Sequence, residues 1–302
     1  MSHSRLHRLF DSGIGWVLLA TCLLSFKGIL ARLAYAQGVS VDTVLIWRFV
    51  IAVPLFWLGA LWLRRGAKAA PLSLVQLGWV AATGALFFAS AWCDFHAIEL
   101  LGASISRVIL YTFPALVMLI QAWQLRQAPN IRQFGIFLLA WLGIALILLP
   151  DWQLGQLSLA GFACAFGAAS CYAVFWCASK PLTQQLGSMR FNQLSNTVTL
   201  VAVLILLLPT RHSGLFDINA LGWLWLLLLV VFATCLPFFL LFEGLRRVNA
   251  SDASLITMFG PVVTVLAAQL VFSDERLVLL QWLGMAVVLG SISLIGKTPV
   301  RS

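Results

Sequence analysis

The feature that most constrains this chain is a series of long apolar segments separated by short polar connections. A helix needs roughly 20 predominantly apolar residues to cross the hydrocarbon core of a bilayer. Ten segments meet this requirement: 13–35, 41–63, 73–94, 102–125, 132–150, 157–180, 192–209, 220–243, 250–272 and 277–296. We therefore predict an all-α integral membrane protein with ten transmembrane helices in a lipid bilayer.

The composition argues for a surface that faces lipid and not water. Charged residues make up 10% of the chain, whereas soluble domains carry roughly 25%. The net charge is +9, but the basic residues form short clusters between segments, so no nucleic-acid partner is expected. All six cysteines lie within apolar segments and lack the spacing of metal ligands or of a disulfide framework. We expect no metal and no cofactor.

The distribution of lysine and arginine predicts an orientation. With the N-terminus in the cytoplasm, thirteen basic residues fall in cytoplasmic segments and two, Arg211 and Arg276, fall in periplasmic loops. Basic residues of membrane proteins concentrate in cytoplasmic loops. The chain is therefore expected in a bacterial inner membrane, with both termini in the cytoplasm.

The second half of the chain repeats the first. A shift of 147 residues aligns Phe95–Ser104 with Phe242–Ser251 and places Pro114 on Pro261. Each copy holds five segments, and because five is odd the second copy must enter the membrane from the opposite side. We predict two inverted-topology five-helix repeats as domains: 1–150 and 151–302.

These repeated features carry a family resemblance. Small-residue pairs, Ala103-Ser104 and Ala250-Ser251, open the fourth and ninth helices, and each of these helices has a proline near its middle. Together with the acidic Ser273-Asp274-Glu275 after the ninth segment, they resemble the drug/metabolite transporter superfamily, specifically its EamA-type ten-helix permeases. The first half departs from this pattern, with Arg126-Gln127-Ala128 at the equivalent place.

The resemblance covers nearly the whole chain and implies a secondary transporter, not an enzyme. It implies export of small metabolites by alternating access between the two repeats, with aromatic or bulky apolar amino acids favoured. Drugs, nucleotide-sugars and other metabolites are alternative cargoes. An integral membrane enzyme is a further alternative, for which Asp94, His96 and Glu99 form the candidate catalytic group. The chain is expected to be a monomer, or a homodimer through Gly284, Gly290 or Gly296 of the last helix.

Two prolines are predicted to act as hinges. Pro114 and Pro261 each lack the backbone N–H that would bond the carbonyl four residues earlier, on Leu110 and Thr257 respectively. Freed carbonyls inside a membrane need other partners or a water-filled cavity. We expect paired kinks at a central cavity, although static kinks would give the same pattern.

Polar and aromatic residues within the segments predict the substrate site, because small-molecule sites combine apolar walls with a few placed polar groups. The substrate-binding candidates are Lys27, Phe87, Ser90, Trp92, Arg107, Tyr111, Gln121, Tyr172, Trp176, Thr257 and Met258. Lys27, the deepest cation, is expected to meet a substrate carboxylate. Arg48, Asp94 and Glu99 are expected to form intramembrane ion pairs. No aspartate or glutamate lies in the middle of a segment, so a carboxylate proton relay is not expected.

Overall fold

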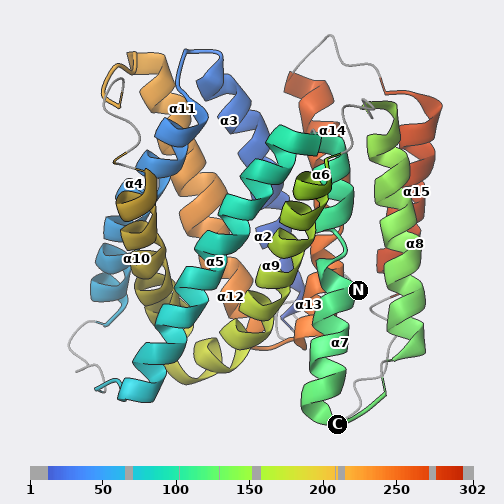
Figure 1. Cartoon of the computed structure of the whole chain (residues 1–302), viewed down its shortest axis with the longest axis horizontal. Coiled ribbons are helices and arrows are strands. Elements are labelled where there is room, and N and C mark those ends of the chain that lie inside the picture. Colours follow the sequence, from blue (N-terminus) through green and yellow to red (C-terminus); the bar gives the residue numbers. More distant parts are fainter. Residues whose placement is uncertain are drawn as a thin grey trace, which may run out of the picture. The chain divides into compact units, whose positions relative to one another are not determined.

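The computed structural model describes residues 13–64, 71–101, 103–128, 130–151, 158–207, 209, 215–271 and 277–294. Within these ranges the regular structure is helical and contains no strand (Figure 1). Nine helical stretches in this part of the chain are long and apolar enough to cross a membrane, and a shorter apolar helix, Leu279–Ser293, follows them. All ten predicted segments correspond to helices, which confirms the all-α membrane fold.

Several spans are divided into shorter helices by local breaks. The elements in chain order are α2 (Ile14–Ser25), α3 (Lys27–Tyr35), α4 (Val41–Arg64), α5 (Leu74–Leu101), α6 (Ala103–Leu110), α7 (Phe113–Leu125), α8 (Ile131–Leu148), η1 (Leu149–Asp151), α9 (Leu159–Leu186), α10 (Ser188–Leu207), α11 (Ala220–Val230), η3 (Val231–Cys235), α12 (Leu236–Leu245), α13 (Ala250–Thr257), α14 (Gly260–Val271) and α15 (Leu279–Ser293).

Three predicted boundaries are wrong. The third segment was predicted to end at 94, but α5 continues seven residues further, to Leu101. The sixth segment was predicted to end at 180, but α9 continues through Pro181 to Leu186. The turn is Gly187 alone, with a φ of +80°, a left-handed conformation that glycine adopts without steric cost. The next helix, α10, already begins at Ser188, four residues before the predicted start at 192. One glycine can therefore replace the longer connection that the charged residues suggested.

The residues gather into two compact units that do not follow the sequence halves. The first unit comprises Met1–Phe88 and Ala178–Arg247, and the second comprises Ala89–Cys177 and Val248–Ser302. Each unit thus takes helices from both halves of the chain. The long helices α5 and α9 contribute residues to both units.

The first unit is built on three close helix pairs: α2 with α12, α4 with α10, and α3 with α11. Gly244 allows α12 to approach α2, because a Cβ at that position would lie 2.6 Å from the Val17 Cγ2 atom. Between α3, α4 and α11 lies a core that includes Ala34, Val44 and Leu226. Small residues at such contacts let helices approach without a hydrophobic driving force.

The second unit contains a similar glycine contact between α8 and α15, which lie side by side (Figure 1). A Cβ on Gly284 would lie 2.6 Å from the carbonyl oxygen of Gly143. The prediction of a dimer face through Gly284 is therefore wrong, because α8 of the same chain covers this glycine. Gly290 has no atom within 4 Å of its Cβ position, and Gly296 lies outside the described residues.

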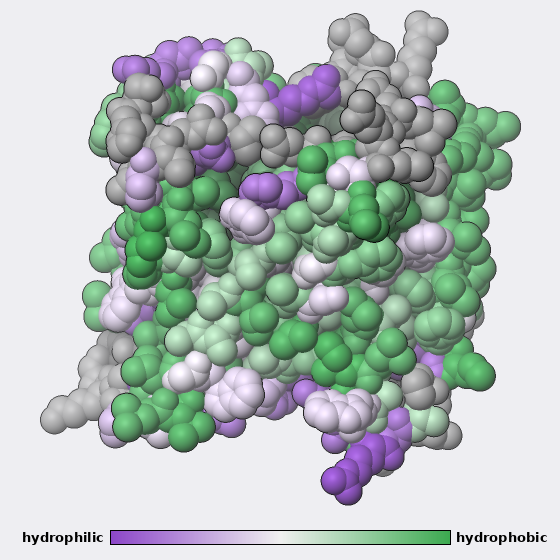
Figure 2. All heavy atoms as spheres, viewed as in Figure 1, coloured by the Kyte–Doolittle hydropathy of each residue, from purple (hydrophilic) through white to green (hydrophobic). Residues whose placement is uncertain are grey.

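The surface is suited to lipid. Figure 2 shows a face covered mostly by hydrophobic side chains, with the hydrophilic ones gathered toward the upper and lower edges of the view. Leu61, Trp62 and Leu270 are each more than 60% exposed. Leu61 and Trp62 close the second span and Leu270 lies in the ninth, so large apolar side chains in membrane-crossing helices face outward, where acyl chains replace water.

Candidate functional site

The fourth and ninth spans are interrupted by the same kind of turn just before each proline. Helix α6 ends at Leu110 and α7 begins at Phe113, so Pro114 occupies the first turn of the new helix. Helix α13 ends at Thr257 and α14 begins at Gly260, which gives Pro261 the same position. Proline is favoured in the first turn of a helix, because a backbone N–H there would have no acceptor within the helix and its loss costs nothing. Both predicted hinge positions therefore coincide with helix breaks.

The hydrogen bonds of the two breaks correspond across the repeat. The Thr112 N–H donates to the Ile109 carbonyl over 2.9 Å, and the Phe259 N–H donates to the Ile256 carbonyl over 3.1 Å. Both bonds span three residues where an α-helix would span four. The positions are related by the same 147-residue shift that aligns the prolines. The two copies therefore share a backbone conformation as well as a residue type.

Side chains complete the backbone bonding around each break. Because the Thr112 N–H has turned to Ile109, the Val108 carbonyl lacks its usual helical donor, and the indole N–H of Trp141 in α8 donates to it over 3.0 Å. In the ninth span the Thr257 hydroxyl donates to the Ser254 carbonyl over 2.6 Å. These bonds give carbonyls at the breaks a partner within the protein, as a membrane interior requires.

An aromatic cluster packs against the first break. Phe113, the first residue of α7, lies 4.8 Å from the Tyr172 ring and 5.8 Å from the Trp176 ring, measured between centroids. Trp176 is fully buried, and its indole N–H donates to the carbonyl of Ala250, the first residue of α13. Met258, between α13 and α14, is also fully buried. Tyr172, Trp176 and Met258, all predicted to bind substrate, thus lie at or beside the broken helices.

The remaining predicted polar residues of the second unit tie helices together. The amide oxygen of Gln121 in α7 accepts hydrogen bonds from the backbone N–H and the hydroxyl of Ser251, so it caps the start of α13. The Ser90 hydroxyl in α5 donates to the Ala168 carbonyl in α9 over 3.0 Å. The first contact fixes the start of α13 to α7, and the second joins α5 to α9.

One predicted acidic residue and one predicted basic residue form an ion pair in the second unit. Asp94 of α5 and Arg107 of α6 lie 3.2 Å apart, and Tyr111 lies one turn beyond Arg107, at the break. Trp92 is 45% exposed, and its ring centroid lies 4.0 Å from that of His96, with the ring planes tilted by 37°. Glu99 belongs to α5, but its side chain lies outside the described part of the chain.

The first unit holds an arginine among aromatic rings. The Arg48 Nε–H donates to the Thr234 hydroxyl over 2.9 Å, and the guanidinium carbon lies 5.3 Å from the centroid of Phe49 and 5.8 Å from that of Phe238. Phe87 contacts both rings edge-on, at 6.3 and 5.6 Å. We refer to Arg48, Thr234, Phe49, Phe87 and Phe238 as the arginine cluster. Lys27 belongs to the same unit and begins α3, directly after the bend at Phe26.

A π-helical turn places Thr234 in the arginine cluster. The turn, Val231–Cys235, lies in the middle of the eighth span, and the Thr234 hydroxyl donates to the carbonyl of Leu229, five residues earlier. Single π-turns inside α-helices occur often at functional sites. The same hydroxyl accepts the Arg48 bond, so the π-turn helps to fix the position of the guanidinium.

Comparison with known proteins identifies the family. The EamA-like transporter family matches this chain twice, over residues 11–149 and 159–297. The chain belongs to the EamA-like transporter family. Membership indicates a multi-pass membrane transporter of small molecules and not an enzyme.

Individual relatives of this EamA-like transporter agree with the assignment. The chain is 29% identical over 295 residues to the uncharacterized transporter YcbK of Bacillus subtilis (strain 168), covering 90% of this chain and 89% of YcbK. It is 26% identical over 301 residues to the uncharacterized transporter sll0355 of Synechocystis sp., covering 93% and 87%. A solved crystal structure matches with a TM-score of 0.81 at 16% identity, covering 96% of this chain and 99% of the other. That similarity supports the fold.

The predicted site of the EamA-like transporter divides between the two units. Lys27, Arg48 and Phe87 belong to the first unit, and every other predicted site residue belongs to the second. Two groups on which other predictions depended lie outside the described residues: the acidic Ser273–Glu275, and basic residues used for the orientation, such as Arg5 and Lys297.

Sequence reasoning missed two polar groups of the first unit. Helix α10 carries a row of buried amides and hydroxyls. The presence of Asn192, Gln193 and Asn196 inside an apolar segment could have indicated this row from the sequence. Glu243, 8% exposed near the end of α12, accepts a hydrogen bond from Ser188 and pairs with two arginines that follow it.

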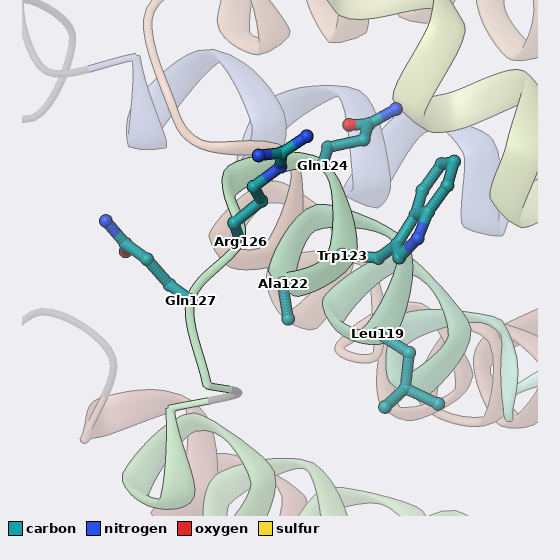
Figure 3. A pocket seen from close by; sticks show the side chains of 6 residues that line it. All are labelled: Leu119, Ala122, Trp123, Gln124, Arg126 and Gln127. Carbon is teal, nitrogen blue, oxygen red and sulfur yellow. The ribbon is translucent and has the colours of Figure 1, made fainter.

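A surface hollow of about 730 Å³ lies at the end of α7, apart from these groups. Its lining residues are Leu119, Ala122, Trp123, Gln124, Arg126 and Gln127. Figure 3 shows their side chains pointing in different directions around the helix end, without converging on a common point. Trp123 is 80% exposed, as expected of an aromatic residue in the interfacial belt. This hollow does not have the form of a substrate site.

Proposed function

We propose that this EamA-like transporter exports amphipathic small molecules bearing a carboxylate, with aromatic and bulky apolar amino acids first. The arginine cluster carries the proposal. A guanidinium binds a carboxylate through two parallel hydrogen bonds, and phenylalanine rings suit the apolar part of an amino acid. The direction is out of a bacterial cytoplasm, across an inner membrane in which both termini face the cytoplasm.

The depth of Arg48 supports a functional role for its charge. It lies six residues beyond Asp42, where the second span begins, which places it about 9 Å along the helix at 1.5 Å per residue. A charge at the centre of a bilayer costs roughly 2.5–3.5 kcal/mol on insertion scales, and retained intramembrane charges usually serve a function. Arg48 replaces Lys27 as our preferred carboxylate ligand, because Arg48 is held by Thr234 and its guanidinium lies over the rings of Phe49 and Phe238.

The paired helix breaks support transport by alternating access. The breaks before Pro114 and Pro261 share a hydrogen-bond pattern, and the family matches the chain once in each half. We take the halves 1–150 and 151–302 to be inverted repeats. Alternating access in such transporters commonly involves rearrangement of discontinuous helices around the bound substrate. In this view the two breaks are hinges at which α7 and α14 change direction.

Flux measurements on proteoliposomes test the substrate proposal. Purified protein is reconstituted, and saturable exchange of labelled phenylalanine is compared with that of phenylalaninamide, which lacks the carboxylate. Arg48→Gln should lower kcat/KM for phenylalanine about 10–100-fold, which corresponds to losing one charged hydrogen-bonded contact. It should leave phenylalaninamide nearly unchanged, and Arg48→Lys should give an intermediate value.

Arg126→Gln is the matched control, since Arg126 is exposed at the end of α7 and lines the surface hollow. This variant should exchange phenylalanine like the wild type. Absence of saturable flux for every amino acid in a panel would refute the cargo. An unchanged preference for phenylalanine over its amide in Arg48→Gln would refute the role of Arg48.

A further inference from the structure

Helix α10 presents a polar face to the interior of the first unit. Six of its residues are polar and no more than 4% exposed: Ser188, Asn192, Gln193, Ser195, Asn196 and Thr199. Most follow the three- and four-residue spacing that places side chains on one side of a helix. Such a row inside a membrane-spanning helix is costly, because polar groups there have no water to bond. The row therefore requires partners within the protein or a ligand.

The side-chain amide groups of the two asparagines on this face already donate hydrogen bonds. The Asn192 Nδ2 group donates to the Ser188 carbonyl over 2.9 Å and to the Phe238 carbonyl of α12 over 3.3 Å. The Asn196 Nδ2 group donates to the Asn192 carbonyl over 2.9 Å. Both side chains thus turn their donors toward backbone carbonyls, so the oxygen end of the Asn196 amide is directed away from these bonds.

Two side-chain oxygens on this face have no donor within the described part of the chain: Gln193 Oε1 and Asn196 Oδ1. The two residues are only 3% and 4% exposed. Each oxygen carries a partial negative charge that burial leaves uncompensated. Because the residues are three positions apart, their side chains are neighbours on the helix surface.

Neighbouring helices of the first unit pack around this part of α10, and both residues are buried. Helix α4 packs along α10, and the Trp57 indole donates to Thr197, one turn after Gln193. On another side, the Thr199 hydroxyl donates to the Gly84 carbonyl of α5 over 3.1 Å. Helices α4, α5 and α12 therefore enclose the segment that carries the two oxygens.

We propose that Gln193 and Asn196 form a binding site for a small monovalent cation. Neutral amide oxygens suit a hard cation such as Na⁺, and an ammonium group can use the same acceptors. Divalent ions are less suited, because they are usually held by carboxylates, and no cluster of acidic, histidine or cysteine ligands occurs among the described residues. The cation is either a coupling ion or the ammonium group of the substrate, and the second reading rests on the proposed amino-acid cargo.

Thermal unfolding of the purified wild-type chain separates the two sources. At constant ionic strength, NaCl is compared with choline chloride, whose cation has no N–H donor, and with methylammonium chloride. If Na⁺ is the ligand, Tm should rise by about 3 °C for each tenfold increase above its Kd. If a substrate ammonium is the ligand, methylammonium should raise Tm and NaCl should not. Neither result depends on the transport assay. Failure of the amino-acid cargo proposal can therefore be distinguished from failure of the cation-site proposal.

Gln193→Met tests the residue, because it keeps the side-chain length and removes the amide. It should raise Tm in choline chloride, since an unpartnered polar group is lost, and abolish the cation-dependent rise. Gln193→Glu should lower the Kd of the cation about tenfold by adding a negative charge. Thr199→Val is the control: it removes a hydrogen-bonded hydroxyl from the same helix, so it should lower Tm and leave the cation response intact.

The proposal is overturned if neither cation raises the Tm of the wild type. It is also overturned if Gln193→Met retains the response, or if this variant fails to fold, because the glutamine would then be a structural residue with partners of its own.

Discussion

The contact between α8 and α15 gives a stability prediction with a matched control on the same helix. We expect Gly284→Ala to destabilise the protein and Gly290→Ala to leave it unchanged or slightly more stable. An added methyl group at Gly284 would lie 2.6 Å from the Gly143 carbonyl oxygen and 2.9 Å from the Ile147 backbone nitrogen. Both are backbone atoms of α8, so they cannot rotate away and the helices must separate.

The magnitude follows from two opposing terms. Overpacking a close contact costs roughly 1–3 kcal/mol, whereas replacing glycine by alanine inside a helix gains up to about 1 kcal/mol. The second term applies equally to Gly290, where nothing lies within 4 Å of the Cβ position. The difference between the two variants therefore isolates the packing cost, about 1–3 kcal/mol in favour of Gly290→Ala. At roughly 2–4 °C per kcal/mol for a chain of this size, it should exceed about 2 °C in Tm.

The assay is thermal unfolding in detergent, with size-exclusion chromatography of each variant alongside. Equal Tm values for Gly284→Ala and Gly290→Ala would refute the close approach of α8 and α15. If Gly284→Ala changed the oligomeric state and left the Tm of the monomer unaltered, Gly284 would face a second copy of the chain after all. Gly143→Ala should reproduce the effect from the other side, since its methyl group would meet the Gly284 carbonyl at 2.8 Å.

Three further outcomes are expected. Glu243→Gln should lower the free energy of unfolding by about 1–2 kcal/mol in thermal or denaturant melts. The variant loses two ion pairs, whose arginine side chains are 38% exposed, and keeps the hydrogen bond from Ser188. An unaltered Tm would contradict this prediction. Trp141→Phe should cost about 1–3 kcal/mol in the same melts by leaving the Val108 carbonyl without its indole donor, and a neutral result would mean that another donor replaces it. Pro114→Ala should slow exchange in proteoliposomes roughly fivefold. The restored N–H could bond the Leu110 carbonyl if the break closed into a continuous helix, and this bond of about 1 kcal/mol would have to be broken again at the hinge. An unchanged rate with an unchanged Tm would refute the hinge.

The membrane fold could be predicted from the sequence because the length of each apolar segment decides it. A segment long and apolar enough to cross the bilayer must form a helix there, since its backbone has no other way to satisfy its hydrogen bonds. The ends of segments are less constrained. Charge and proline suggested a stop at 180, but one proline does not end a membrane helix whose neighbours support it, and Gly187 makes the turn instead.

The candidate site could be predicted only where it depends on residues that are close together in the sequence. Pro114 and Pro261 mark the breaks because the missing N–H acts on residues a few positions away. The partner of the first break, Trp141, lies 33 residues from Val108, and no local pattern connects them. Likewise, the sequence shows Asn196 only as a polar residue in an apolar segment. The packing of α4, α5 and α12 is needed to show that its oxygen has no donor among the described residues.

In the mechanism that we propose, the two compact units separate two requirements of a transporter. Both proline breaks belong to the second unit, and the arginine cluster and the polar face of α10 belong to the first. Charges and unpartnered oxygens need a fixed surrounding structure, because their binding strength depends on preset geometry and a low dielectric. A hinge needs the opposite, a helix that can change direction at small cost. Placing recognition in one unit and the breaks in the other allows each to be adjusted without disturbing the other. Since each unit draws on both halves of the chain, the duplication that supplied two similar breaks also left each half free to supply different side chains for recognition.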